Sequence, residues 1–341
     1  MVEWKKIGDV CELERGVRVI KKDLQQEGLI PVYQNSLTPL GYFDKSNYPA
    51  NTPFVICAGA AGEIGFCNKP FWAADDCTCI LCSSSANKKY IYYCLLVNQH
   101  TLKSQVRKAS VPRLSKDVIG KLIIPIPSLS EQQRIVNILD TFTSSIDNLK
   151  EQIAQRRKQY EYYRDQLLDL EGKEGVEMKT LGELSYKISS GRNKNKEDQG
   201  LYPVFGSTGI IAYTNSYLFD KQLILVARVG ANAGYVYMIN EKCDVTDNTL
   251  IIETKEDNNR KFIYYYLVYM NINQFAKGGG QPLITGGLLK EISIPLPSLQ
   301  DQQRIVSILD TFEASIQNLE AQLSQREKQY EYYRNKLLAF E

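Results

Sequence analysis

The amino-acid sequence predicts an α+β fold with an internal tandem duplication: two similar globular domains separated by a two-helix antiparallel coiled coil, related by pseudo-two-fold symmetry. Three observations support this prediction. The stretch QQRIVNILDTF at 132–142 returns as QQRIVSILDTF at 302–312, within 47 aligned residues of which 31 are identical. Each copy continues into a long heptad pattern of apolar residues. Weaker similarity precedes each copy, as in KKYIYYCL at 88–95 and RKFIYYYL at 260–267.

The duplication divides the 341 residues into four segments. We expect a first globular domain at 1–124, a first long helix at 125–171, a second globular domain at 172–294 and a second long helix at 295–341. A chain of this length is expected to contain about two domains, each with its own hydrophobic core.

Each globular domain shows several short apolar runs broken by glycines. TPFVICAGAAGEIGFC at 52–67 and QLILVARVGANAGYVYMI at 222–239 have this pattern, which is typical of neighbouring strands joined by turns. A Tyr-rich helix is expected at Tyr90–Val97 and again at Phe262–Tyr269. Strands mixed with a short helix predict the α+β class.

Both long helices begin after a Pro-x-Pro segment, IPIPSLSEQQ and IPLPSLQDQQ, because proline ends a strand and fits the first turn of a helix. Ser128 and Ser298 are the expected N-caps. Glu131 stands three residues after Ser128 and fits a capping box, and Asp301 holds the same place in the second copy.

The heptad pattern predicts the coiled-coil core, because apolar residues recur at steps of four and three over more than four repeats. A helix of about 36 residues is roughly 54 Å long and cannot bury such a stripe alone. The obvious partner is its own copy, and the short connections favour an antiparallel pair. The predicted core positions are Ile135, Leu139, Phe142, Ile146, Leu149, Ile153, Tyr160, Tyr163, Leu167, Ile305, Leu309, Phe312, Ile316, Leu319, Leu323, Tyr330, Tyr333 and Leu337.

Composition is that of an ordinary globular protein, with 43% hydrophobic and 23% charged residues. No run reaches the roughly 18–20 apolar residues of a membrane span, and the N-terminus lacks the apolar core of a signal peptide. We therefore expect a soluble, cytoplasmic protein without a membrane contact. The formal net charge of +2 is small for a freestanding nucleic-acid binder, so affinity for DNA would be local or supplemented by a partner.

Candidate catalytic and metal-binding groups are few. Cys77, Cys79 and Cys82 lie in a strand-like run without a second ligand pair, which favours buried strand cysteines over zinc. His100 is the one histidine. GAAGEIG at 59–65 and GANAG at 230–234 match no phosphate-loop pattern, and the carboxylates of AADD and VTDN suit turns. The sequence predicts no metal, no cofactor and no catalytic activity in this chain.

Polar and basic loops are the remaining candidates for function. Their side chains can contact phosphates, and Arg, Asn and Gln can read base edges through two hydrogen bonds. A charged loop is more often plain solvated surface, so each is a hypothesis. The DNA-binding candidates are Gln34, Asn35, Arg107, Lys108, Ser110, Arg113, Arg192, Asn193, Lys194, Lys196, Ser207, Arg228, Asn232, Lys277 and Gln281.

The chain resembles the DNA specificity subunit of type I restriction-modification systems over essentially its full length. IPIPSLSEQQRIVNILD and IPLPSLQDQQRIVSILD, each leading into a long helix after a globular unit, carry the resemblance. It implies two target-recognition domains that each read one half of a bipartite double-stranded DNA site, with the helices as a molecular ruler. It also implies docking of two methyltransferase subunits that hold the methyl donor, and leaves room for an ATP-driven restriction subunit.

Other interpretations remain open from the residues alone. The chain could be a coiled-coil scaffold whose two modules bind proteins or sugars. A methyltransferase fused to its own recognition domain would need a methyl-donor pocket, which the sequence does not show. Tyr162 and Tyr332 are either partner contacts or ordinary helix surface.

Overall fold

The computed structural model describes residues 2–20, 22, 24–108, 110–193, 197, 199–278 and 280–340. It divides into two compact units. Unit 1 combines Met1–Glu151 with Glu320–Glu341, and unit 2 is Gln152–Leu319. Each unit thus contains one globular part, the first half of one long helix and the second half of the other. Among the helices that the structure describes, none is both long and apolar enough to cross a membrane.

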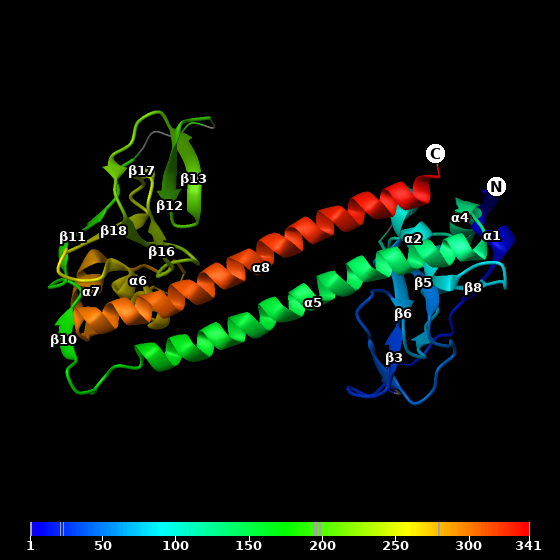
Figure 1. The fold of residues 1–341 in the computed structure, drawn as a ribbon, viewed down its shortest axis with the longest axis horizontal. Helices are drawn as coiled ribbons and strands as arrows, with labels where there is room; N and C mark the ends of the chain where they lie inside the picture. Colours follow the sequence, from blue (N-terminus) through cyan, green and yellow to red (C-terminus); the bar gives the residue numbers. More distant parts are fainter. Residues whose placement is uncertain are drawn as a thin grey trace. The chain divides into compact units, whose positions relative to one another are not determined.

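The globular part of unit 1 combines strands and short helices (Figure 1), and its described residues form three small sheets. The largest has strand order β2-β8-β5-β6, a second has order β4-β3-β7, and β1 pairs with β9. All pairings are antiparallel except β3 with β7. The elements are β1 Glu3–Lys6, α1 Ile7–Val10, β2 Cys11–Arg15, β3 Ile30–Tyr33, β4 Gly41–Phe43, β5 Thr52–Ile56, β6 Ile64–Cys67, β7 Trp72–Ala73, β8 Cys77–Cys82, α2 Lys88–Val97, α3 Gln99–Ser104, α4 Lys116–Lys121 and β9 Ile123–Ile126.

Unit 2 repeats this arrangement, with sheets β11-β18-β15-β16, β13-β12-β17-β14 and β10-β19. The single parallel pairing, β12 with β17, corresponds to β3 with β7. The prediction of two similar α+β domains is therefore confirmed. The elements are β10 Glu177–Thr180, β11 Ser185–Ser190, β12 Tyr202–Gly206, β13 Gly209–Thr214, β14 Phe219–Asp220, β15 Leu223–Ala227, β16 Val236–Ile239, β17 Lys242–Val245, β18 Thr249–Thr254, α6 Arg260–Tyr269, η2 Ile272–Phe275, α7 Gly286–Glu291 and β19 Ser293–Leu296.

The two long helices are α5, Leu129–Leu168, and α8, Leu299–Ala339. Ser128 and Ser298 cap them, since their Oγ atoms accept hydrogen bonds from the backbone N of Glu131 (3.4 Å) and Asp301 (3.2 Å). The Glu131 side chain does not complete the expected capping box. Its carboxylate instead accepts two bonds from Arg134 at 2.6 and 2.7 Å, because a charged partner one turn away competes for it.

Helix halves pair in antiparallel fashion within each unit. In unit 1 the ring centroids of Phe142 and Tyr333 are 5.3 Å apart, and Lys150 Nζ lies 3.5 Å from Glu327 Oε1. In unit 2 Tyr163 stacks on Phe312 at 5.4 Å. The predicted boundaries at 124 and 294 fall inside β9 and β19, strands that pair with the globular parts.

The aliphatic positions of the predicted seam are buried or half-buried, with Ile135, Leu139, Ile305 and Leu309 almost fully covered. Phe142, Leu149, Tyr160, Leu167, Phe312, Ile316, Leu319, Leu323, Tyr330 and Leu337 are half-buried, and Ile146 and Ile153 are buried. Tyr163 and Tyr333 were expected in the core but are 45% and 42% exposed. Each lies flat on a phenylalanine ring, which leaves its other face to solvent.

Candidate nucleic-acid interface

A short basic loop of unit 1 lies between α3 and α4. A β-bridge closes it: the backbone N of Arg107 donates to the carbonyl of Arg113 at 2.9 Å, and the reverse bond is 3.2 Å. A second bridge joins Arg113 to Ala58, just after β5. The side chains of Arg107, Lys108, Ser110 and Arg113 are all exposed. Backbone bonds therefore hold three predicted cations at the surface of this unit.

A cleft of about 500 Å³ opens at the base of this loop. It combines basic and acidic side chains, since its lining includes Arg15, Asp75, Asp76, Arg107, Arg113 and Lys116. Gln34, a predicted DNA contact, lies beside it and donates through Nε2 to Asp76 Oδ2 at 3.4 Å. Asn35 is exposed, and its carbonyl accepts a bond from the backbone N of Ala60. The structure thus places two of the predicted residues, Arg107 and Arg113, in the lining of one cleft, with Gln34 bonded to a third lining residue, Asp76.

Arg15 belongs to this cleft although sequence reasoning missed it. Its Nε donates to the carbonyl of Asp75 at 2.6 Å, and its Nη2 lies 4.0 Å from Asp75 Oδ2. The next residue, Gly16, packs so closely on the turn that a Cβ would lie 2.2 Å from the carbonyl oxygen of Ala74. The Arg-Gly pair at the end of β2 was the available signal, because only glycine lets that strand end meet the Asp75–Asp76 turn.

Unit 2 has a corresponding loop with different side chains. A bridge joins Lys277 to Leu283 through bonds of 3.1 and 2.9 Å, and another joins Leu283 to Val229. Lys277 and Gln281 are exposed. Arg228, just after β15, donates through Nη1 to the carbonyl of Asp247 at 3.3 Å. Arg228 and Lys277 therefore lie on neighbouring parts of this domain.

The other predicted residues of unit 2 are spread out. Ser207 is half-buried in the connection between β12 and β13, and Arg192 is exposed after β11. Asn193 is half-buried and donates to Asp244 Oδ2 at 2.6 Å, so its amide group holds this loop to β17 and does not face solvent freely. Lys194 and Lys196 lie outside the described residues.

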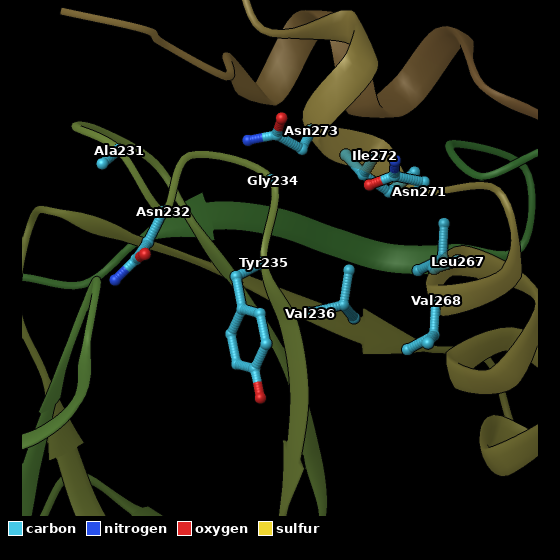
Figure 2. Close-up of a pocket in the computed structure, with 10 residues that line it drawn as sticks. All are labelled: Ala231, Asn232, Gly234, Tyr235, Val236, Leu267, Val268, Asn271, Ile272 and Asn273. Atoms are coloured by element: carbon cyan, nitrogen blue, oxygen red, sulfur yellow. The ribbon is translucent and has the colours of Figure 1, made fainter. Parts of the chain in front are cut away.

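A pocket of about 430 Å³ lies between the β15–β16 connection and the end of α6 (Figure 2). Asn232 and Tyr235 project from the connection, and both are exposed. Asn273 closes the other side, where its Nδ2 donates to the carbonyl of Ala233 at 2.6 Å. Amide and phenol groups beside a small apolar wall can hold a flat polar group, but this pocket contains no charged side chain among its lining residues.

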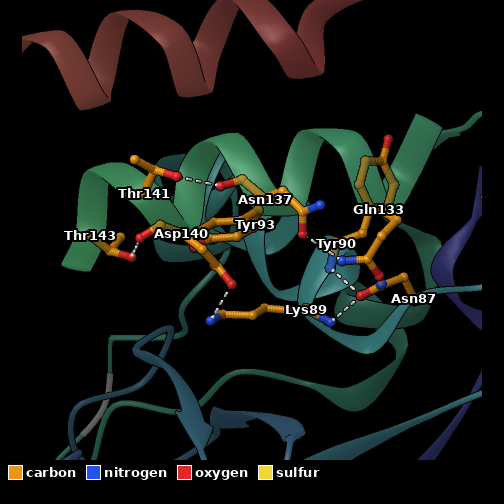
Figure 3. Close-up of polar contacts among 9 residues, drawn as sticks. All are labelled: Asn87, Lys89, Tyr90, Tyr93, Gln133, Asn137, Asp140, Thr141 and Thr143. Carbon is orange, nitrogen blue, oxygen red and sulfur yellow. Dashed lines mark hydrogen bonds and ion pairs between the residues drawn. The ribbon is translucent and has the colours of Figure 1, made fainter. Parts of the chain in front are cut away.

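A polar junction fastens the globular part of unit 1 to α5 (Figure 3). Asn87 caps α2 through Oδ1, while its backbone N and Nδ2 donate to Gln132 and Gln133, both at 2.8 Å. Asp140 accepts a 2.6 Å bond from the Tyr93 hydroxyl and pairs with Lys89 at 2.9 Å. These contacts use three residues of the repeated QQRIVNILD sequence.

Unit 2 has the same junction. Gln302 and Gln303 accept bonds from Asn259 at 3.0 and 2.8 Å, and Asp310 accepts bonds from Tyr265 and Lys261, both at 2.7 Å. Burial, and then the hydrogen bond to Asp310, raises the pKa of Tyr265 above its usual range. Attachment of each domain to its helix is thus one reason for the repeat. The sequence alone does not reveal this reason, because helix pairing and partner docking would also favour identical helices.

The cysteines are structural side chains in this fold. Burial raises the pKa of Cys94 and Cys243 to about 12, so both thiols stay protonated near neutral pH, and a protonated thiol is a poor nucleophile. Cys77 and Cys79 are buried in β8 as predicted, whereas Cys82, at the end of the same strand, is only half-buried. Within the described ranges no three His, Cys, Asp or Glu side chains are grouped to hold a metal ion.

Exposed basic side chains on equivalent bridged loops of two similar but unequal domains are typical of a nucleic-acid recognition protein. A family model described as "Type I restriction modification DNA specificity domain" matches residues 1–156 and again 173–327. The chain belongs to this family: it is a type I restriction-modification specificity subunit with two target-recognition domains. We call residues 1–124 and 172–294 domain 1 and domain 2 below.

Relatives of known name agree with this assignment. The EcoprrI specificity subunit of Escherichia coli is 30% identical over 92% of this chain and 80% of its own length. The EcoR124I/EcoR124II specificity subunit of Escherichia coli is 30% identical over 99% and 94%. The solved S subunit of the M. genitalium type I system has a TM-score of 0.77 at 20% identity, covering 99% of this chain and 96% of that chain. These matches give no support to the scaffold interpretation.

Proposed function

We propose that this specificity subunit binds double-stranded DNA with a bipartite site, each target-recognition domain reading one half. The observation that carries the proposal is the pair of equivalent surfaces with different chemistry. The bridged loop presents Arg107 and Arg113 in domain 1 but Lys277 and Leu283 in domain 2. Two domains with the same fold but different surface side chains suit the recognition of two different half-sites.

The two long helices act, in this proposal, as one antiparallel coiled coil that fixes the gap between the half-sites. Their exposed faces, including Tyr162 and Tyr332, offer equivalent docking surfaces for two methyltransferase subunits, and restriction subunits can join that complex. The methyl donor and ATP belong to those partners, so this chain is a non-catalytic subunit. Its compartment is the cytoplasm, where its DNA lies.

Binding of duplex DNA by the complete chain with its methyltransferase partner tests the proposal. We expect a dissociation constant that rises steeply with salt, because cationic loops release counterions on contact with phosphates. A specific duplex should bind at least about 1,000-fold more tightly than random sequence. A complex that assembles but shows no salt-dependent duplex binding would contradict the proposal and return the scaffold to consideration.

A further inference from the structure

One arginine in each domain is fastened to the same backbone carbonyl of an equivalent turn. The turns are Asp75–Asp76, between β7 and β8, and Asp247–Asn248, between β17 and β18. Arg15 Nε donates to the carbonyl of Asp75 at 2.6 Å, and Arg228 Nη1 donates to the carbonyl of Asp247 at 3.3 Å. The two domains therefore share the tether.

The two arginines reach this carbonyl from different strands. Gly16 and Gly191 hold equivalent places, because each packs against backbone carbonyls just before the turn, and a Cβ added to either glycine would lie 2.2 Å from the nearest carbonyl oxygen. The residues that precede these glycines are therefore equivalent, so Ser190 of domain 2 corresponds to Arg15 of domain 1. The backbone N atoms of Cys57 and Arg228 both donate to the second residue of the turn, at 2.6 and 2.9 Å. Cys57 is therefore the domain 1 equivalent of Arg228. Each domain keeps one arginine at the turn, but on opposite sides of it.

We propose that Arg15 and Arg228 are the guanine-reading residues of domain 1 and domain 2. This inference rests on the proposed function. A guanidinium has five N–H donors. The tether of Arg15 uses Nε and leaves both terminal nitrogens for a ligand, although Nη2 also lies 4.0 Å from Asp75 Oδ2. Arg228 is half-buried, and its tether uses the terminal Nη1, so Nη2 and Nε are the donors that it can offer. Two parallel N–H groups match O6 and N7 of guanine in the major groove.

The carboxylate beside Arg15 favours a base edge over a phosphate at this one point of the domain 1 cleft. The lining as a whole is net positive, with Arg15, Arg107, Arg113 and Lys116 against Asp75 and Asp76. Asp75 Oδ2, however, lies 4.0 Å from Arg15 Nη2, and its charge would repel a phosphate placed against that arginine. A carboxylate can instead accept a bond from N4 of cytosine, so an arginine with a neighbouring carboxylate complements a whole G·C pair. Arg107 and Arg113, which line the same cleft from the exposed loop, and Lys108 on that loop can supply the phosphate contacts.

The test is the recognised sequence of complexes that carry Arg15→Lys or Arg228→Lys. Lysine keeps the charge but loses the planar fork. We expect Arg15→Lys to remove the requirement for one G·C pair in one half-site, and Arg228→Lys to do so in the other half. Discrimination at that position should fall from roughly 5- to 150-fold to nearly none, measured by binding duplexes with each base pair substituted in turn.

Further variants keep the test decisive. Arg15→Ser installs the residue that domain 2 carries at this place and should relax the same position, so it replaces Arg15→Lys if that variant fails to assemble. Arg113→Ala serves as the phosphate-type comparison, with uniformly weaker binding and a salt slope lower by about 1. Unchanged stringency in both lysine variants, or uniform weakening like that of Arg113→Ala, would overturn the inference while the proposed function stands. A wild-type complex without any split site would remove the proposed function itself.

Discussion

Asp140 of α5 and Asp310 of α8 each bind two side chains of a short helix, α2 in unit 1 and α6 in unit 2. Tyr93 and Lys89 bind Asp140, and Tyr265 and Lys261 bind Asp310. Tyr93 is 1% exposed, and its hydroxyl, which also lies beside the Thr143 side chain, donates its hydrogen bond to that carboxylate. A buried hydroxyl without a partner costs more than the bond itself contributes, which makes this aspartate important for domain attachment.

We expect Asp140→Ala to lower the free energy of unfolding by about 1–3 kcal/mol, because the buried Tyr93 hydroxyl loses its acceptor. Urea denaturation of the complete chain measures this. Asp147→Ala, at an exposed position of the same helix, should change stability by less than about 0.5 kcal/mol. In a Tyr93→Phe background the Asp140→Ala effect should shrink, and an equal effect in both backgrounds would show that the hydrogen bond is not its cause.

Buried tyrosines and cysteines predict a loss of stability at alkaline pH. Burial raises the pKa of Tyr92 and Tyr237 from 10.0 to about 12, and that of Cys94 from 9.0 to about 12. The folded chain holds these protons more tightly than the unfolded chain. The contribution of these groups to the free energy of unfolding is therefore complete below about pH 9 and is lost as the pH rises toward 12. Urea midpoints at pH 8 and pH 11 under reducing conditions should show a clear decrease, and equal midpoints would contradict this account.

At the scale of elements, the side chains along the seam of each helix pair change from aliphatic to aromatic and cationic. Aliphatic side chains such as Ile135 and Leu139 are buried where α5 packs on domain 1. Further along α5, Phe142 lies between Tyr333 and the guanidinium of Arg326, which is 5.7 Å from the ring centroid. Arg156 stands over Phe312 in the same way. The gap that Arg156 and Arg326 make in the heptad pattern is thus filled by cation–π contacts.

Ile146→Asp tests the seam of unit 1. Ile146 is 7% exposed, so the variant loses a buried aliphatic side chain, at roughly 2–5 kcal/mol, and places an unpaired carboxylate in its site. We expect a lower urea midpoint and lower helicity by circular dichroism. The matched variant Tyr162→Asp, on an exposed face of α5, should be nearly neutral, and equal effects of the two changes would contradict the pairing.

The sequence alone predicted the long helices, the Tyr-rich helices and the central apolar strands. The proline and serine before each long helix, the Tyr-rich helices and the β8 strand are local signals that depend on neighbours within a few residues, and the repeat adds a comparison between two parts of the chain. The Arg15–Gly16 pair is a local signal, but it does not identify Asp75, the partner of Arg15, which lies 60 residues away and is brought near by the pairing of β2 with β8. The inward turn of Asn193 likewise depends on Asp244, 51 residues distant.

At the scale of the whole molecule, the proposed ruler makes a prediction about distance. Inserting seven residues in both α5 and α8 keeps the heptad register and adds about 10 Å of helix. The gap between half-sites should grow by about 3 base pairs, at about 3.4 Å each. The recognised sequences of such variants measure this. A seven-residue insertion in one helix alone should abolish recognition, and an unchanged gap after matched insertion would contradict the ruler.

The central claim is that one chain directs modification to a split DNA site through two unequal domains. The most direct measurement is a map of modified bases across the genome of the source organism, with and without this gene. The account predicts that one motif loses its methylation when the gene is removed, and that this motif has two short specific halves around a fixed gap. An unchanged map, in cells shown to express both the chain and its methyltransferase partner, would contradict it.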